Sequence, residues 1–520
     1  MNIAIIYPNQ LFETKYLPYD VRIIDCFILV EDSLFFSDTK RKLKFNMLKL
    51  IYQRASMKYY ESYLKEHRLK VFYLNWTGKA DLVFDFIVKK FGSENTLHII
   101  DPTDHLLSKR ILKYSKSQSV TIYENPSFLL TKSDLQSYVE YASKMNRKIF
   151  YQYNFYIWHR KRSEILIDSH GKPVGGKYSF DKYNRQPIRS DRIENTIKAV
   201  KSTIKKYHGK FYESAIKYCE RTFKNYYPEN YEPNNIFYYP ITHSDSKAHY
   251  KQFLKHKIQY FGLYQDAMIF SSTEADLFAS MTLFHSVCSI QLNNGLLVPS
   301  DIERLILDYY HTHKKKKDIL HPIEGFIRQL NWREYVRFIY LYSYDDIIRK
   351  NYFRNRRHLT LDWYKGTTGI EPVDQAIRFA FRFGYLHHII RLMVVCNFMN
   401  LCQIHPTDVY KWFMEFSLDS YDWVMLANVY SMGMYADGGL ATTKPYISSS
   451  NYILRMGHIR EGGSGNWETA WKILYYFFIY RNGSKLKGRG QMYLSHWSKQ
   501  SNKKLIIENA VQLIKSLTKK

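Results

Sequence analysis

The sequence is poor in cysteine, which argues against a disulfide-built protein. Five cysteines occur in 520 residues, and no two have the CxxC spacing of redox and zinc motifs. An odd number in mostly apolar surroundings is typical of reduced thiols in a core. We therefore expect a reducing intracellular compartment, cytoplasm or nucleus. The five are Cys26, Cys219, Cys288, Cys396 and Cys402.

The sequence also lacks long hydrophobic runs and glycine-rich phosphate motifs. No apolar run reaches the ~18 residues of a membrane-spanning helix. The N-terminus, MNIAIIYPNQLF, is short and has no basic segment, so it predicts a first strand and not a signal peptide. Neither GxGxxG nor GxxxxGK[ST] occurs, which leaves no dinucleotide fingerprint and no P-loop. We find no internal repeat.

Acidic residues are scarce beside basic ones. The chain has 76 Lys and Arg against 48 Asp and Glu, a formal net charge of +28. This excess favours a polyanionic partner, nucleic acid first; a biased, AT-rich genome is the alternative explanation. The aromatic content of 17% excludes a disordered chain. The length allows two or three domains with sizeable cores.

Residues 1–130 alternate short apolar strands with helical segments. This alternation predicts a parallel sheet with helices on both faces. A ligand would lie at the carboxyl ends of the strands, where Gln10 and Glu31 fall; a purely structural domain is the alternative. The expected strands are 2–7, 21–30, 70–74, 96–100 and 119–123, and the expected helices 43–67, 77–91 and 103–114.

Residues 131–240 form a basic, aromatic connector with a turn-rich GKPVGG stretch. Rings interleaved with cations are typical of a segment that grips a DNA backbone, and a solvated linker is the alternative. Residues 241–500 have the period of an all-helical domain, with helices expected at 274–283, 299–310, 324–342, 373–383 and 469–480. The tail, 501–520, predicts a basic amphipathic helix lying on the surface as an appendage.

The stretch from Gly384 to Ser450 mixes polar and ring residues with apolar ones. It opens with two adjacent histidines, His387 and His388, at the start of an apolar helix. So many polar and aromatic residues among buried-looking ones suggest a pocket for a planar ligand. Two neighbouring histidines can differ in pKa, which suits one of them to act as a general acid. A pair of structural histidines is the alternative.

Several motifs in order give the chain a family resemblance. They are RASMKYYESYL, PVGGKYSFDKYNR, LFHSVCSIQLNNGLL, EGFIRQLNWREYVR, GYLHHIIRLM and DGGLATTKPYISSS. The chain resembles the photolyase/cryptochrome superfamily, and more narrowly its deoxyribodipyrimidine photolyase-related branch. The resemblance covers nearly the whole chain. It implies an N-terminal α/β antenna domain and a C-terminal all-helical domain that holds FAD beside a pocket for UV-damaged DNA.

The resemblance also implies roles for single residues. The FAD contacts would be His285, Ser286, Ser289, Asn293, Arg333, Arg391, Asp422 and Asn428. The lesion would meet Gln329, His387, His388 and Tyr446, and the DNA would meet Trp332, Lys177, Asp181, Arg185 and Lys444. Electrons would reach the flavin through Trp412, Trp363 and Tyr364, although Phe413 stands where relatives have Tyr and Tyr364 where they have Trp. Gln10 and Glu31 would meet an antenna chromophore, a lumazine, deazaflavin or folate. For each residue, a helix cap or core packing is the alternative.

Two features bear on the reaction. His388 matches the residue believed catalytic in (6-4) photolyases, where many cyclobutane-dimer enzymes have Asn, so we expect a monomeric (6-4) photolyase. A cyclobutane-dimer photolyase and a blue-light sensor without repair are the alternatives. Relatives bind an iron–sulfur cluster through four cysteines, but the first position falls at about Pro372 and residues 456–471 contain no cysteine. We therefore expect no cluster and no metal.

Overall fold

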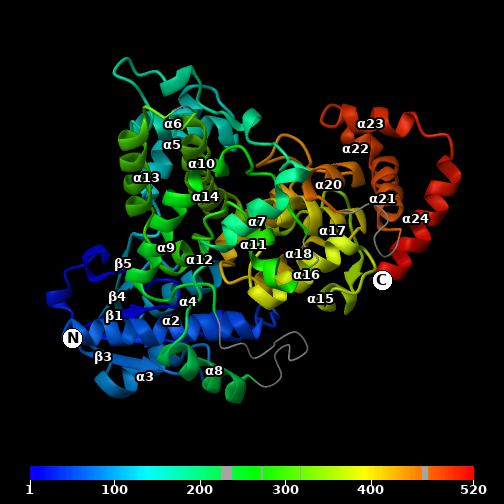
Figure 1. Ribbon diagram of the computed structural model, residues 1–520. Helices are drawn as coiled ribbons and strands as arrows, with labels where there is room; N and C mark the ends of the chain where they lie inside the picture. The colour runs from blue at the N-terminus through cyan, green and yellow to red at the C-terminus, as the bar shows by residue number, and fades with distance from the viewer. Residues whose placement is uncertain (224–236, 271–272, 317, 460–465) are drawn as a thin grey trace.

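The computed structural model describes residues 1–223, 237–270, 273–316, 318–459 and 466–520 (Figure 1). Its N-terminal part is built on one five-stranded parallel sheet, as predicted, with the strand order β3-β2-β1-β4-β5. The residues of β2 are fully buried, as expected for a strand covered on both faces. The strands are β1 (Asn2–Ile6), β2 (Cys26–Val30), β3 (Val71–Leu74), β4 (Thr96–Ile100) and β5 (Ser119–Tyr123).

Two details of this part differ from the prediction. The second strand begins at Cys26, because Val21–Ile23 form a 3₁₀ turn that Asp20 caps through the amide of Arg22. The helices begin later than expected but end close to the predicted positions. They are α2 (Met47–Glu66), α3 (Leu82–Phe91) and α4 (His105–Tyr114), and α8 (Lys210–Thr222) packs along α2 (Figure 1).

The rest of the chain is mostly helical, as predicted. Its longest helix is α14 (Leu320–Ile348), and two π-helices, η8 (Ile390–Cys396) and η9 (Leu426–Gly433), lie beside each other. The main α-helices around them are α16 (Glu371–Phe383), α18 (Pro406–Phe416), α20 (Ser450–Gly457) and α21 (Trp467–Arg481). Others are α5 (Lys132–Lys144), α6 (Gln152–Arg162), α7 (Ile193–Lys201), α9 (His243–His256), α10 (Ile258–Phe261), α11 (Leu277–Thr282), α12 (Ser289–Asn294), α13 (Pro299–His313), α15 (Asp362–Lys365), α17 (Asn397–Leu401), α19 (Asp422–Met425), α22 (Gly483–Leu486) and α23 (Gln491–Ser498).

Helix α16 shows how local sequence sets the element that leads into the site. It begins with Pro372 at its first turn, where a missing amide costs no hydrogen bond. It ends at Gly384, whose φ of +62° lies in the left-handed region that favours glycine. A Cβ at Gly384 would also collide with the side chain of Leu418. The chain therefore turns at Gly384 and delivers His387 and His388 to the interior.

One hydrophobic core runs through both the sheet and the helices. It contains Ile5 and Leu29 of the sheet as well as Phe398 and Trp412 of the helical part. Helix α2 adds a polar contact, since the buried Lys49 ammonium donates to the carbonyl oxygens of Met414 at 2.7 Å and of Ser420 at 2.9 Å. The two parts are therefore joined by packing and by hydrogen bonds, and the three predicted boundaries between the four segments stay predictions.

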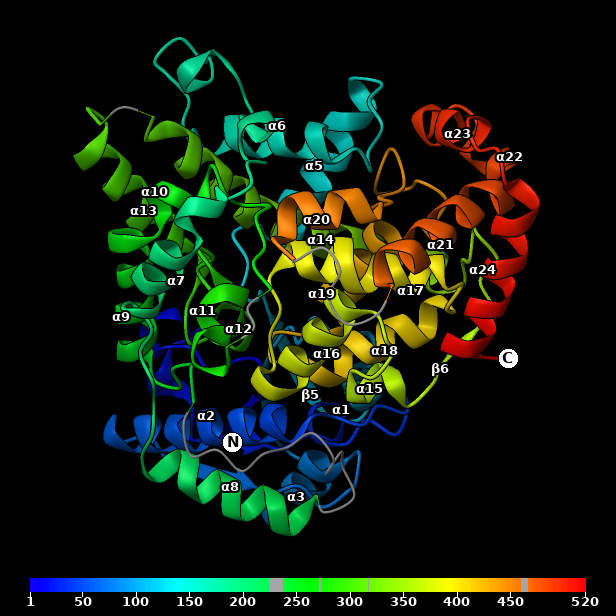
Figure 2. The same ribbon diagram turned by 45° about the vertical axis from the view of Figure 1, so that its right-hand side comes forward.

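The C-terminal segment corrects one prediction. The helix α24 (Lys503–Leu517) packs against α21 (Figure 2), and Ala510, Ile514 and Leu517 are buried. The short strand β7 (Thr518–Lys519) then pairs antiparallel with β6 (His358–Leu359). The tail is therefore part of the core structure and not a surface appendage, because its apolar stripe is covered by α21. Among the described helices, none is both long and apolar enough to cross a membrane.

Candidate functional site

A cavity of about 250 Å³ lies where the two π-helices meet α14. Gln329 and Trp332 of α14 line it, together with Arg391 of η8 and Asn428 of η9. π-Helical turns are rare and concentrate at functional sites. Gly433 allows η8 and η9 to approach, because a Cβ there would collide with the Cys396 thiol. The aliphatic wall consists of Leu386, Ile389, Leu392, Val424, Met425 and Val429.

A second cavity of about 390 Å³ adjoins the first. Gln329, Trp332 and His388 line both cavities and form a shared wall. The second cavity is the more polar of the two. Its remaining polar side chains are Gln152, Ser179, Asp181, Arg185, Gln265, Asp266, Arg328, Tyr446, Tyr452 and Arg455. The residues predicted to meet the lesion thus gather around one space, His387 excepted, while Lys177 and Lys444 are exposed and belong to neither lining.

A buried ion pair lies in the first cavity, and one of its partners, Asp419, was not among the predicted site residues. Arg391 donates to both carboxylate oxygens of Asp419, at 3.0 and 3.1 Å. Asp419 also accepts from the hydroxyls of Ser289, at 2.6 Å, and Ser417, at 2.5 Å. Burial alone would raise the pKa of Asp419, but Arg391 and the two hydroxyls hold it below its usual value. The cavity therefore contains a fixed carboxylate and guanidinium side by side.

The two adjacent histidines have different positions. His388 lines both cavities, whereas His387 is fully buried behind them and stacks on His285, with ring centroids 4.3 Å apart. Burial, followed by the charge of Arg391, lowers the pKa of His388 to about 4. Burial and the neighbouring His285, His388 and Arg391 lower the pKa of His387 further. Both rings are therefore neutral at pH 7 in the ligand-free chain, which argues against a preformed imidazolium acid.

The loop before α12 carries backbone strain next to the first cavity. Val287 has a φ of +58°, which a β-branched residue rarely adopts and which costs about 1–3 kcal/mol. The same loop presents His285 and Ser286 to the cavity, and Ser289 follows as the first residue of α12. Among the described residues, no partner reaches the buried Nε2 atom of His285. A polar atom without a partner beside a strained loop indicates a place for a ligand with polar groups.

Asn428 is held by hydrogen bonds on both sides. Its amide oxygen accepts from the indole of Trp332 at 3.1 Å, and its amide nitrogen donates to the carbonyl of Val424 at 2.8 Å. This pair fixes the Trp332 ring as part of the wall between the cavities. A planar ligand in the first cavity would meet an oriented amide, an ion pair and an apolar wall, which together fit a flavin.

Two predicted cofactor residues lie behind the first cavity. Arg333 donates to the amide oxygen of Asn293 at 3.1 Å, and its guanidinium stacks over Phe128 and Trp423. Asn293 in turn donates to the carbonyl oxygen of Asp419 at 2.8 Å. Neither residue lines the cavity, so their role is to support Asp419, and the prediction of direct contact is not supported.

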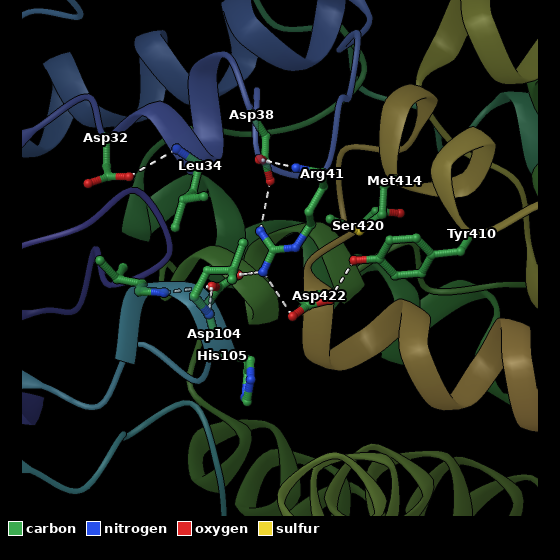
Figure 3. A network of polar contacts seen from close by, with 12 residues as sticks. Asp32, Leu34, Asp38, Arg41, Asp104, His105, Tyr410, Met414, Ser420 and Asp422 are labelled. Atoms are coloured by element: carbon green, nitrogen blue, oxygen red, sulfur yellow. Dashed lines mark hydrogen bonds and ion pairs between the residues drawn. The ribbon is translucent and has the colours of Figure 1, made fainter. Parts of the chain in front are cut away.

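Asp422 belongs to a different network (Figure 3). Its carboxylate accepts from Arg41 at 2.9 Å and from the phenols of Tyr340 and Tyr410, at 2.7 and 2.5 Å. Arg41 also pairs with Asp38 at 2.8 Å and Asp104 at 2.7 Å, which belong to the sheet part. Asp422 is absent from both cavity linings. The predicted flavin contact of Asp422 is therefore corrected: Asp422 joins the two parts of the chain, and Asp419, three residues earlier, takes the cavity position.

The aromatic residues predicted to carry electrons lie on one side of the first cavity. Phe413 lines the cavity and is 5.0 Å from Trp412, between ring centroids. Trp412 lies 5.7 Å from Phe381, which lies 6.0 Å from Tyr364. The buried Trp363 meets this group through its carbonyl oxygen, which accepts from the Trp412 indole at 2.8 Å. The structure thus brings the three predicted residues together.

The predicted antenna contacts are not supported. One oxygen of the buried Glu31 carboxylate accepts from Arg54 and from Tyr73, and the other from the Trp76 amide and Tyr218. The amide of Gln10 donates to the carbonyl oxygen of Ile100 at 2.8 Å. The protein itself uses these polar groups, so neither residue presents a free side chain to a chromophore.

The cysteines do not form a site in the described part of the chain. All five thiols are buried and free of disulfides. Within the residues described, no three histidine, cysteine or acidic side chains lie close enough together to hold a metal ion. Residues 460–465, from the segment without cysteine, lie outside the described residues.

Comparisons with known proteins match both parts of the chain. Residues 4–230 match the family model of deoxyribodipyrimidine photo-lyase-related proteins, and residues 326–456 match the FAD binding domain of DNA photolyase. A (6-4) photolyase of Agrobacterium fabrum is 32% identical over 383 residues, which cover 72% of this chain and 70% of that protein. An uncharacterised protein of Acanthamoeba polyphaga mimivirus is 55% identical over 189 residues, which cover 36% of this chain and 95% of that protein. Among solved structures, a bacterial class III photolyase from Agrobacterium tumefaciens aligns over 99% of this chain and 97% of its own, with a TM-score of 0.54 and 14% identity.

Proposed function

This chain belongs to the photolyase/cryptochrome superfamily, in its deoxyribodipyrimidine photolyase-related branch, and from this premise we propose that it is a light-driven DNA repair enzyme. The observation that carries the proposal is the wall shared by the two cavities. Gln329, Trp332 and His388 separate a cavity of about 250 Å³ with a largely apolar wall from a more polar one. We propose that the first holds FAD and the second a pyrimidine lesion flipped out of the DNA.

The residues of the first cavity fit the cofactor. FAD, when bound, absorbs blue light and supplies the electron that repair requires. Asn428 would hold one edge of the flavin ring system with an oriented amide. Ser286 would hold its phosphates, joined by Ser289 once its hydroxyl leaves Asp419, and the Arg391–Asp419 pair would place a fixed dipole beside the ring. Ile389 and Leu392, which line both cavities, would exclude water from the space between the ligands.

The second cavity would hold the flipped-out lesion, two joined pyrimidines of one strand, by charge and by ring stacking. Arg185, Arg328 and Arg455 line it, and Trp332 offers a face on which a base can stack. Lys177 and Lys444 are exposed and would meet the DNA backbone outside the cavity. The formal net charge of +28 agrees with a polyanionic partner. We propose that one monomer binds one damaged duplex.

We propose the (6-4) photoproduct as the preferred lesion. The ring of His388 lies in the wall of the lesion cavity, where it can pass a proton to the lesion during rearrangement. Its pKa of about 4 requires that a bound anion, such as a DNA phosphate or an electron-loaded lesion, raise this value before His388 acts as an acid. Repair of a cyclobutane dimer is the second candidate, and the neutral state of His388 favours it, because that reaction needs no proton.

The test uses two oligonucleotides, one with a (6-4) photoproduct and one with a cyclobutane dimer. Chemically reduced protein receives blue light, with dark controls, and repaired strands are counted. Repair of the first lesion alone, lost in His388→Ala with FAD still bound, supports the proposal. Repair of the second alone in both proteins moves the assignment to the cyclobutane dimer. Repair of neither by FAD-loaded protein assigns the chain to light sensing without repair.

A further inference from the structure

A fully buried carboxylate lies near the start of α14. One oxygen of Glu324 accepts a hydrogen bond from the phenol of Tyr156 on α6 at 2.7 Å, and the other accepts from the backbone amide of Phe180 in the connector at 3.1 Å. Arg328, one turn further along α14, forms an ion pair with this carboxylate at 3.3 Å. Burial of a carboxylate is costly unless such partners compensate for the lost water. Here the partners come from three segments, so Glu324 fastens these segments to one another.

Each of the three segments also lines the second cavity. Helix α6 contributes Gln152 to the lining, α14 contributes Arg328, and the connector contributes Ser179, Asp181 and Arg185. Glu324 is not part of the lining. Its hydrogen bonds therefore set the position of the cavity wall from behind, without reaching the space that a ligand would occupy.

The connector packs closely on α14 at the same place. The ring of His321 stacks on Phe180 and on Tyr183, with ring centroids 4.5 and 5.4 Å apart. Gly175 has a φ of +77°, and a Cβ there would collide with the side chain of Leu320. Residues 175–183 are therefore held against the first turns of α14 by ring stacking and close backbone approach as well as by the buried carboxylate.

Arg328 links the buried carboxylate to the cavity. Its Nε atom faces Glu324 at 3.3 Å, and its Nη1 atom meets the carboxylate of Asp181 at 3.1 Å. Asp181 also pairs with Arg185. A guanidinium grips a phosphate with two parallel hydrogen bonds only when its planar group has the right orientation. Glu324 thus fixes the orientation of Arg328 and, through the connector, the place of Asp181 and Arg185.

From these contacts we propose that Glu324 is a positioning residue for lesion binding. It holds connector residues 179–185 on α14 and aims Arg328 at a phosphate of the flipped-out strand. The inference rests on the proposed function of the second cavity. The exposed Lys177 and Lys444 lie outside this arrangement and would still attract any DNA backbone. Glu324 should therefore affect the preference for damaged DNA and leave the general affinity for DNA intact.

The test measures binding in the dark to three duplexes of one sequence, with a (6-4) photoproduct, with a cyclobutane dimer and undamaged. FAD-loaded proteins are titrated and Kd is read from fluorescence anisotropy. Glu324→Gln replaces one acceptor oxygen by a donor and removes the charge opposite Arg328. We expect its Kd for the preferred lesion to rise about 10-fold, and its Kd for undamaged DNA to change by less than about 2-fold. The milder Tyr156→Phe, which removes one hydrogen bond, should raise the lesion Kd roughly 3-fold.

A matched control separates positioning from loss of stability. Asp374 of α16 is also a buried carboxylate that fastens a loop, since it accepts from the amides of Thr368 and Gly369 at 2.8 Å each. It lies outside both cavity linings, so Asp374→Asn should lower Tm as Glu324→Gln does and keep the lesion preference. In Glu324→Gln, flavin retention and kcat of the reduced protein should match wild type while KM rises. Hydrogen exchange should become faster in residues 175–185.

The outcomes separate this inference from the repair function. Dark binding needs neither light nor reduction, so an absence of repair does not affect the test. If wild type prefers damaged DNA and Glu324→Gln prefers it equally, the inference is overturned and the proposed function stands. An equal loss of preference in Asp374→Asn would also overturn it, because the effect would then be one of stability. If wild type binds damaged and undamaged DNA alike, the proposed lesion site is refuted, and the role of Glu324 with it.

Discussion

Loss of the Asp419 carboxylate should be among the most damaging single changes to this protein. In Asp419→Asn the Arg391 guanidinium stays buried opposite a neutral amide, and one of its two bonds would face an NH₂ donor instead of an oxygen. Removing one partner of a buried ion pair costs about 3–5 kcal/mol. Wild-type Asp419 is only 5% exposed, so water cannot replace the lost partner.

This energy translates into a small but measurable shift in melting. Unfolding entropy is about 2.1 cal/mol/K per residue, or roughly 1.1 kcal/mol/K for the whole chain if it unfolds in one step. A loss of 3–5 kcal/mol then lowers Tm by about 3–5 °C. Because the pair lies in the proposed flavin cavity, Asp419→Asn should also lose FAD affinity, measured by flavin retention on dialysis.

A second variant separates charge from shape. Arg391→Gln in the Asp419→Asn background removes the stranded cation, so the double variant should recover part of the lost stability. Asp422→Asn is the matched comparison, since Asp422 lies outside the cavity and should change Tm without changing flavin retention. If Asp419→Asn has the same Tm as wild type and keeps its flavin, the assignment of Asp419 to the cofactor cavity is wrong.

Three other predictions follow from the structure. Burial raises the pKa of Asp104 to about 6, although the charge of Arg41 acts to lower it, so the folded state takes up a proton between about pH 4 and 6. As pH falls through that window, the free energy of unfolding of wild type should rise relative to that of Asp104→Asn by up to ~3 kcal/mol. Denaturant unfolding measures this difference, and a difference that does not change with pH would refute the raised pKa. Ile514→Ala on α24 should cost about 2–4 kcal/mol, whereas Val511→Ala, 39% exposed, should cost well under ~1 kcal/mol; equal costs would show that α24 is not docked in solution. Metal analysis of protein purified without oxygen should find no stoichiometric iron, and a full complement of iron would contradict the inference drawn from the missing cysteines.

Much of the fold was readable because its signals are local. The five strands and the three helices between them follow from alternating apolar runs, which also predict a parallel sheet. The order of the strands was not predicted, because it depends on how the connections cross. The second strand was predicted too long because the turn at Val21–Ile23 depends on the Asp20 cap, a single hydrogen bond. The prediction that the C-terminal helix is a surface appendage was wrong, because amphipathic spacing shows that one face is apolar but not which element covers it.

The site divides in the same way. His388, Trp332 and Gln329 were identified from motifs, and the structure brings them to one wall. Asp419 was missed in favour of Asp422, because both lie in SLDSYD and only tertiary contacts decide which carboxylate meets Arg391 and which meets Arg41. The spacing of Asp419 and Asp422 was a usable signal, because two carboxylates three residues apart can pair with different cations. Glu31 was predicted to contact a chromophore, but its carboxylate accepts hydrogen bonds from Arg54, Tyr73 and Tyr218. These partners are distant in sequence, so no sequence motif could have indicated them.

The hydrogen bonds from Lys49 to the segment around Asp419 couple helix α2 thermodynamically to the first cavity. Lys49 on α2 holds the carbonyls of Met414 and Ser420, so α2 and the segment carrying Asp419 cannot move independently. A flavin that orders this segment must then stabilise α2 by the same free energy with which α2 favours the flavin. Hydrogen exchange in α2, which does not line the cavity, should therefore slow when the cofactor binds. The sheet part would thus contribute to the free energy of flavin binding at the proposed site, whether or not it holds a chromophore of its own.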